Sequence, residues 1–184
     1  MILGIDPGLS GAVAIVDAAG ALVAVHDMPT LTLRVARGTK QTYDVPGMCA
    51  LLGPYAGAGL HVVIEASQAM PGQGVRSMFS TGYGYGLWLG ILAALQVPYT
   101  PVRPAVWKQA LRLGKDKEQV RLRAQQLFPA ADLRRKKDHG RAEALLLTYW
   151  GLAGSRAIPH REPRDRADHG STQGEAHDDA RHLL

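Results

Sequence analysis

Two acidic residues end apolar, strand-like segments of this chain. Asp6 follows Met-Ile-Leu-Gly-Ile, and Glu65 follows His-Val-Val-Ile. If the two strands are neighbours in an open sheet, their carboxyl ends border one crevice and the carboxylates converge there. Carboxylate oxygens suit Mg²⁺ or Mn²⁺ rather than Zn²⁺, so the pattern indicates a site for a hard divalent cation. The alternative interpretation is that each acid only caps the turn that follows it.

A second group of acids opens the last predicted helix. Asp138, His139 and Glu143 lie there, directly after the basic run Arg134-Arg-Lys-Lys. His139 and Glu143 are four residues apart and share one helical face. Asp138 is five residues from Glu143, so it must reach a common site from the helix cap. In the competing interpretation Asp138 is an ordinary N-cap and Glu143 is a first-turn acid favoured by the helix dipole.

The elements that must position these acids are short and mix strands with helices. Residues 1–6, 12–16 and 21–26 are three strands joined by tight turns, which predicts an antiparallel meander. Apolar periodicity and cap residues predict the remaining elements: strands at 60–65 and 97–102, and helices at 44–52, 75–95, 104–111, 117–128 and 142–152.

Two further patterns concern the surface. Residues 31–43 predict a solvent-exposed ribbon that carries Arg34, Arg37 and Lys40. On the helix at 75–95, glycines recur at every fourth position, and each costs about 1 kcal/mol of helix propensity relative to alanine. This row, Gly82, Gly86 and Gly90, predicts a close approach of another backbone, either within the fold or across a dimer.

Size and composition indicate one α/β domain at residues 1–153 in a chain of 184 residues that is 46% hydrophobic. Cys49 is the single cysteine, so no internal disulfide can form and a cytoplasmic location is expected. Apolar runs such as Ile91–Leu95 are far shorter than the ~20 residues of a membrane helix. Residues 154–184 are polar and hold four of the seven histidines without metal-ligand spacing, so we expect a disordered tail.

The net charge of +5 conceals an uneven distribution. Residues 1–153 contain sixteen Lys and Arg against ten Asp and Glu, and twelve of those sixteen bases fall between Arg103 and Arg141. A basic stripe of this kind favours a polyanionic partner such as nucleic acid. A solvated helix face is the competing interpretation.

The acidic motifs, taken together, resemble the RuvC family of Holliday-junction resolvases. The resemblance rests on Gly-Ile-Asp6-Pro-Gly, on Glu65 at a strand end, and on Asp138-His-Gly-Arg-Ala-Glu-Ala-Leu-Leu. The segment Ala69-Met-Pro-Gly-Gln-Gly, the following Ser77-Met-Phe and the Lys-Lys before Asp138 are most similar to the RuvC-like proteins of phages and prophages. The resemblance covers roughly residues 1–152.

This resemblance implies a ribonuclease H-like α/β fold: a mixed five-stranded sheet, made of the antiparallel meander plus two parallel strands, flanked by helices. It further implies a homodimer that nicks branched DNA, such as four-way junctions, in recombination. The expected cofactor is Mg²⁺, with Mn²⁺ able to replace it and two ions in each site. No membrane partner and no organic cofactor are expected, since neither a dinucleotide fingerprint nor a Gly-Lys-Ser/Thr phosphate loop is present.

The resemblance also assigns roles to residues. The metal ligands would be Asp6, Glu65, Asp138 and Glu143. His139 competes with Asp138 as a catalytic residue, because some family members place a histidine among the ligands. This chain departs from the family at the last acid. The family usually has Asp there, three residues after its partner, whereas Glu143 stands five residues after Asp138. The expected DNA contacts are Arg76, Phe79, Lys108, Lys115, Lys117, Arg121, Lys136 and Lys137.

Other functions remain open at this stage. The glycine-rich hairpin at residues 4–11 also resembles the phosphate loop of actin-like ATPases, but those enzymes need two such domains and a second nucleotide loop. A non-catalytic junction-binding protein would need no acidic cluster. A ribonuclease H-like nuclease acting on another nucleic acid would keep the cluster and change only the substrate. For the aromatic residues near 79–85, stacking on unpaired bases and packing in the core are the two alternatives.

Overall fold

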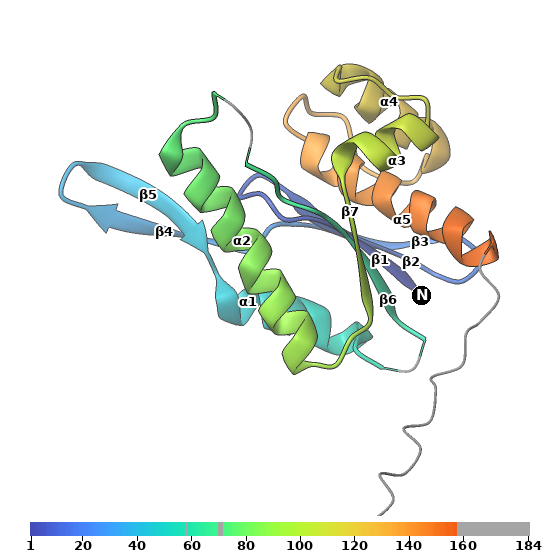
Figure 1. Cartoon of the computed structure of the whole chain (residues 1–184), viewed down its shortest axis with the longest axis horizontal. Helices are drawn as coiled ribbons and strands as arrows, with labels where there is room; N and C mark the ends of the chain where they lie inside the picture. Colours follow the sequence, from blue (N-terminus) through green and yellow to red (C-terminus); the bar gives the residue numbers. More distant parts are fainter. Residues whose placement is uncertain (58, 70–71, 158–184) are drawn as a thin grey trace, which may run out of the picture.

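The computed structural model describes residues 1–57, 59–69 and 72–157. A mixed five-stranded sheet forms its centre, in the order β3-β2-β1-β6-β7 (Figure 1). Strands β1, β2 and β3 form the expected antiparallel meander, β6 pairs parallel to β1, and β7 pairs parallel to β6. The strand bounds are Ile2–Asp6, Ala12–Val16, Leu22–Asp27, His61–Glu65 and Tyr99–Val102.

Helices cover both faces of this sheet (Figure 1). Side chains of the strands alternate between two cores, as the period of two residues in a strand requires. Leu3, Ile5 and Val13 pack on the face covered by α1 and α2, whereas Ile2 and Ala14 pack on the face covered by α3, α4 and α5. The helices are α1 Val45–Leu52, the short 3-10 helix η1 Gly53–Tyr55, α2 Val75–Ala94, α3 Pro104–Ala110, α4 Lys117–Leu127 and α5 His139–Ala157.

Helix α5 lies directly over β1 and over the turn that follows it. A Cβ atom at Gly4 would overlap the carbonyl oxygen of Ala144, and one at Gly140 would overlap the carbonyl oxygen of Ser10. Glycine at both positions therefore lets the start of α5 approach the turn after Asp6. The helix is longer than predicted, because it begins at His139 and continues to Ala157.

Strands β4, Thr30–Val35, and β5, Gly38–Tyr43, form a separate two-stranded ribbon at the predicted place (Figure 1). The glycine row of α2 was expected to contact another backbone either within the fold or across a dimer. No described atom outside the helix lies within 4 Å of a Cβ built at Gly82, Gly86 or Gly90, so a close contact within the fold is excluded there. The row instead borders a shallow apolar groove that Leu87 and Ile91 also line.

None of the described helices is long and apolar enough to cross a membrane. The predicted tail at 154–184 lies outside the described residues from residue 158 onward. The helices predicted at 44–52 and 75–95 are confirmed to within a residue of their observed bounds.

Candidate active site

Asp6 and Glu65 meet at one edge of the sheet. They end β1 and β6, which are parallel neighbours in a register that pairs Ile5 with Ile64. The two carboxylates therefore stand at the same level at the carboxyl ends of adjacent strands. A cleft of about 490 Å³ opens beside them, lined by the turn after β1 and by the segment after β6.

Glu143 joins this pair from helix α5. Burial, then repulsion from Glu143 and Glu65, raises the pKa of Asp6 to about 7. Burial, followed by repulsion from Glu143, likewise raises the pKa of Glu65 to about 7. One backbone donor acts in the opposite direction, since the amide of Gly8 lies 3.2 Å from Oδ1 of Asp6. The three acids thus concentrate negative charge that the surrounding residues only partly compensate.

Helix α3 supplies the two polar partners of this cluster. Nε1 of Trp107 donates a hydrogen bond to Oε2 of Glu65 over 2.8 Å. Nζ of Lys108 lies 2.7 Å from Oε1 of Glu143 and forms an ion pair with it. Lys108 also lowers the pKa values of Asp6 and Glu65, although its effect is smaller than that of burial.

Asp138 stands outside this cluster. Its side chain is buried, and Oδ2 accepts a hydrogen bond of 2.8 Å from the backbone amide of Arg135. Oδ1 accepts a second bond, 2.9 Å long, from Nε of the Arg135 guanidinium. Burial raises the pKa of Asp138, but the bonds from Arg135 prevail and hold it below the usual value. The Asp138 carboxylate therefore stabilises the loop before α5 and is not directed at Asp6.

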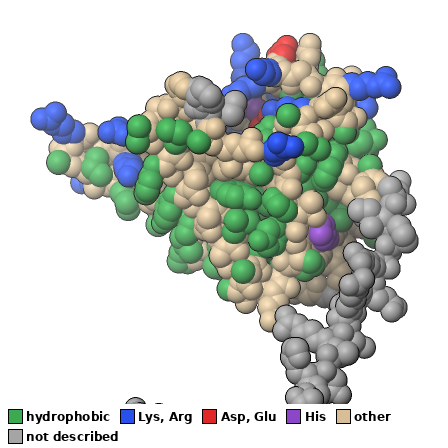
Figure 2. All heavy atoms as spheres, viewed as in Figure 1, with side chains coloured by type: hydrophobic (Ala, Val, Ile, Leu, Met, Phe, Trp, Pro, Cys, Tyr) green, Lys and Arg blue, Asp and Glu red, His purple; other side chains and the backbone are tan. Residues whose placement is uncertain are grey.

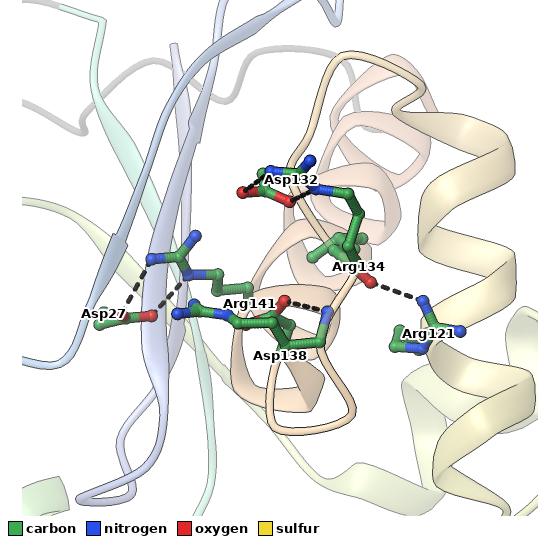
Figure 3. A network of polar contacts seen from close by, with 8 residues as sticks. Asp27, Arg121, Asp132, Arg134, Asp138 and Arg141 are labelled. Atoms are coloured by element: carbon green, nitrogen blue, oxygen red, sulfur yellow. Dashed lines mark hydrogen bonds and ion pairs between the residues drawn. The ribbon is translucent and has the colours of Figure 1, made fainter.

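The loop before α5 belongs to a wider polar network (Figure 3). Nε and Nη2 of Arg141 bind both carboxylate oxygens of Asp27, at 2.5 and 2.9 Å, and so tie α5 to the end of β3. Nη1 of Arg121 donates to the carbonyl oxygen of Leu133 over 2.5 Å, which ties α4 to the same loop. These bonds fix where α5 begins, and hence where Glu143 stands.

His139 is the first residue of α5, one helical turn before Glu143. Its side chain is partly buried. Glu143, one turn further along α5, binds Lys108 on α3.

The three clustered acids are candidate ligands of a divalent cation. Within residues 1–57, 59–69 and 72–157, no three His, Cys, Asp or Glu side chains enclose a point where a metal ion could sit as they stand. Glu143 is bound to Lys108, and Glu65 to Trp107. The donors themselves, three carboxylates of which two have pKa values raised to about 7, fit a hard cation.

The expected DNA contacts fall into two groups. Arg121 and Lys108 are engaged, the first with Glu118 and the second with Glu143. The remaining bases lie on the exposed surface: Arg76, Lys115, Lys117, Lys136 and Lys137.

Phe79 is 74% exposed near the start of α2. Its ring is parallel to that of Tyr83, with centroids 6.2 Å apart. Tyr85, in contrast, packs partly buried against the core, which is the second alternative for this aromatic segment.

Two residues beside the site were missed by the sequence reasoning. Trp107 binds Glu65, and the hydroxyl of Tyr43 donates to the carbonyl oxygen of Pro7, next to Asp6, over 3.0 Å. The one signal in the sequence is the residue type. A buried Trp or Tyr needs a hydrogen-bond partner for its N–H or O–H group.

No protein-family model matches this chain. It is 34% identical over 164 residues to "Holliday junction resolvase MOC1, chloroplastic" of Chlamydomonas reinhardtii, a match that covers 74% of this chain and 18% of that protein. The chain thus spans less than a fifth of the length of this curated relative.

Two solved structures from Thermus thermophilus share the fold. The RuvC structure in complex with a Holliday junction substrate has a TM-score of 0.58 and 18% identity, and covers 85% of this chain and 95% of that one. A second RuvC structure has a TM-score of 0.54 and 20% identity, and covers 85% and 96%. These likenesses confirm the predicted α/β fold. The narrower resemblance to phage and prophage proteins is not tested by them and stays a prediction.

Proposed function

We propose that this RuvC-like chain is a metal-dependent endonuclease that nicks branched DNA and resolves four-way junctions. The observation that carries the proposal is the convergence of Asp6, Glu65 and Glu143 at one edge of the sheet, with two of the pKa values raised to about 7. The negative charge of these carboxylates is only partly compensated by the protein, so cations bound at the mouth of the cleft would reduce their mutual repulsion. The named resolvase relative and the RuvC neighbours support the same reaction.

Asp6, Glu65 and Glu143 would hold the cations, with His139 as the remaining candidate ligand. Asp138 is the weakest of the expected ligands, because Arg135 already occupies both of its oxygens. Mg²⁺, replaceable by Mn²⁺ and present as two ions, is the proposed cofactor. When bound, it supplies Lewis-acid stabilisation of a phosphodiester leaving oxygen and a more acidic water.

The chain's own residues prepare this site. The indole of Trp107 holds the Glu65 carboxylate in one orientation, since a hydrogen bond of 2.8 Å fixes one of its oxygens. Lys108 places an ammonium group among the acids, which would otherwise repel a phosphate. The exposed basic side chains of Arg76, Lys115 and Lys117 are proposed to bind the DNA backbone. The exposed ring of Phe79 is proposed to stack on nucleobases at the branch point.

The other parts of the proposal concern assembly and location. We propose that residues 1–153 form the nuclease and that residues 154–184 form a tail, of which residues 154–157 still belong to α5. We also propose that the protein is cytoplasmic and forms a homodimer. The apolar groove along Gly82, Gly86 and Gly90 is the proposed dimer contact, because nothing within the described residues covers it.

A nicking assay tests the function directly. The purified protein should nick a synthetic four-way junction in Mg²⁺ or Mn²⁺, and should not nick a linear duplex of the same sequence. Asp6→Asn and Glu65→Gln should abolish nicking and leave junction binding intact. The matched controls are Asp17→Asn, in the turn after β2, and Glu118→Gln, in the first turn of α4, because each makes the same chemical change away from the cleft.

The outcomes separate the alternatives. Activity of the Asp6→Asn protein would refute the assignment of the site. Junction binding without cleavage in either metal would identify a non-catalytic junction-binding protein. Cleavage of an RNA–DNA hybrid in preference to the junction would identify a ribonuclease H-like nuclease with another substrate.

A further inference from the structure

The first half of helix α2 has little burial to hold it in place. The fully buried residues of this helix all lie in its second half: Gly84, Trp88, Ile91 and Leu92. No position between Val75 and Tyr83 is buried, and most are exposed. Figure 2 shows mainly apolar and uncharged side chains along the exposed face of α2. Its one charged residue, Arg76, forms no ion pair with any described residue, so hydrogen bonds are the remaining means of fixing this half.

The hydroxyl of Tyr43 joins this half of α2 to the turn that follows Asp6. It lies 3.0 Å from the carbonyl oxygen of Pro7, the residue after Asp6, and 3.4 Å from that of Ser80 on α2. The ring packs edge-on against Tyr83 of the same helix, with centroids 5.9 Å apart. Burial, followed by repulsion from Asp6, raises the pKa of Tyr43 to about 12, so the hydroxyl remains a donor at neutral pH.

Gly84 provides the space for this hydroxyl. A Cβ atom at Gly84 would overlap the hydroxyl and the ring of Tyr43 and would crowd the carbonyl oxygen of Pro7. At Gly82 and Gly86, on either side, no described atom lies within 4 Å of such a Cβ. Because glycine is a poor helix former, the contact with Tyr43 explains its presence at position 84.

A second hydroxyl makes a similar link to the strand end that carries Glu65. Ser67 lies two residues after Glu65, and its Oγ donates to the carbonyl oxygen of Thr81 over 3.4 Å. Thr81 directly follows Ser80, so one turn of α2 receives both hydroxyls. The segments after β1 and β6 are thus both tied to the same place on this helix.

We propose that Tyr43 and Ser67 are positioning residues, which tie the strand ends bearing Asp6 and Glu65 to one turn of α2 and so set the separation of the two carboxylates. The inference rests on the proposed function and adds two residues that act through the backbone and not by contact with a cation. Ligands of a shared cation must be held within a narrow range of positions, and hydrogen bonds from surrounding residues supply this constraint. Phe79 directly precedes Ser80, so a base stacked on Phe79 would act on the same turn of α2.

Cation affinity in the absence of DNA tests this proposal. Wild type, Tyr43→Phe, Ser67→Ala and the double variant are titrated with Mn²⁺, and the free ion is measured by its electron paramagnetic resonance signal. Each single change should weaken Mn²⁺ binding by roughly 10-fold, the lower end of the range for groups that orient metal ligands. The double variant should lose roughly 100-fold if the two links act independently.

The control is Thr148→Val, which also removes a buried hydroxyl that bonds a backbone carbonyl, that of Leu145 on the same helix. Thermal melting is measured for every variant. Thr148→Val and Tyr43→Phe should both melt at a lower temperature than the wild type, because each loses a buried hydrogen bond. Only Tyr43→Phe should bind Mn²⁺ more weakly.

Nicking and junction binding separate positioning from contact with DNA. At saturating junction and Mn²⁺, kcat should fall by roughly 10-fold in each single variant, because the carboxylates are displaced. Affinity for the four-way junction, measured in EDTA, should equal that of the wild type.

The assignment of either residue is wrong if its single variant binds Mn²⁺ as tightly as the wild type. The proposal is also wrong if Thr148→Val weakens Mn²⁺ binding equally, or if junction affinity in EDTA falls as much as kcat, because the hydroxyls would then contact DNA. Ser67 is only partly buried, so Ser67→Ala keeps the test decisive if Tyr43→Phe does not fold. Failure of the proposed function would be seen separately, as a wild-type protein that binds Mn²⁺ but nicks no branched DNA.

Discussion

Trp107 and Glu65 are joined by a hydrogen bond of 2.8 Å between the indole Nε1 and Oε2 of the carboxylate, although 42 residues separate them in the chain. The next residue on the same helix, Lys108, binds Glu143. One short helix thus controls two of the three clustered acids. It orients one of them through a neutral donor and neutralises the other through a charge. The third, Asp6, accepts a hydrogen bond from the backbone amide of Gly8.

Replacing Trp107 with phenylalanine should impair the site more than the fold. The variant keeps an aromatic ring but loses the donor, so the Glu65 carboxylate is no longer held. Removing a hydrogen bond to a side chain that binds a metal typically costs 10- to 100-fold in metal affinity or activity. We therefore expect the Mg²⁺ concentration for half-maximal nicking to rise by roughly that factor.

The control for this prediction is Trp88→Phe. Trp88 is also fully buried, but its Nε1 has no hydrogen-bond partner within the described structure. Both variants should lower the melting temperature through lost packing, and only Trp107→Phe should change the Mg²⁺ requirement. An equal Mg²⁺ requirement in the two variants would show that Trp107 acts through packing alone.

Asp138→Asn should destabilise the protein while sparing the cation site. The substitution weakens the charge-assisted bonds that Arg135 donates, at a cost of roughly 1–3 kcal/mol in the free energy of unfolding. Chemical denaturation measures this cost, and a Mg²⁺ titration of nicking below the melting transition measures the site. Glu143→Gln is the matched comparison and should abolish nicking with a smaller effect on stability. A stable Asp138→Asn protein with a greatly raised Mg²⁺ requirement would instead identify Asp138 as a ligand.

These residues show what the sequence could and could not predict. Asp6 and Glu65 were found because each ends an apolar strand, and the parallel pairing of β1 with β6 brings such ends together. The role of Asp138 was open, because a spacing of five from Glu143 does not reveal that Arg135 captures the carboxylate. Trp107 was missed because its contact depends on how α3 packs after β7. Long-range side-chain partners of this kind leave no periodic signal.

The glycine row of α2 shows a similar limit. Its spacing predicted a surface that another backbone approaches, but the same pattern serves a contact within the fold and a contact between molecules. Only the arrangement of the neighbouring helices distinguishes the two. The start of α1 and the turn of the β4–β5 ribbon depend instead on near neighbours in the chain, because the Asp44 side chain accepts a hydrogen bond from the amide of Gly47 and Gly38 has a positive φ of 100°.

The raised pKa values of Asp6 and Glu65 predict a pH dependence of stability in the absence of divalent cations. Both acids bind protons more tightly in the folded protein, with pKa values of about 7 against 3.8 and 4.5 for the free groups. Their contribution to stability is therefore complete below about pH 4, and it is lost as the pH rises through about 7. Asp6→Asn removes one of these titrations, so its free energy of unfolding should rise relative to the wild type over this range.

Denaturation of the two proteins at several pH values, in EDTA, checks this prediction. Mg²⁺ at saturating concentration should reverse the order above pH 7, because it stabilises only the protein that retains the carboxylate. Asp17→Asn is the control and should run parallel to the wild type at every pH. A constant difference between Asp6→Asn and the wild type would contradict the raised pKa of Asp6.

The last prediction concerns Gly86, in the middle of the row on α2. A leucine there meets no described atom within 4 Å of its Cβ and replaces a poor helix former, so the isolated chain should be at least as stable as the wild type. If two copies meet along this groove, however, the leucine would occupy the space of the partner's helix. We expect Gly86→Leu to convert a dimer to a monomer in sedimentation equilibrium without lowering the stability of the monomer. Ala153→Leu, at an exposed position of α5, is the control and should remain dimeric. A Gly86→Leu protein that still dimerises would place the contact between subunits elsewhere on the molecule.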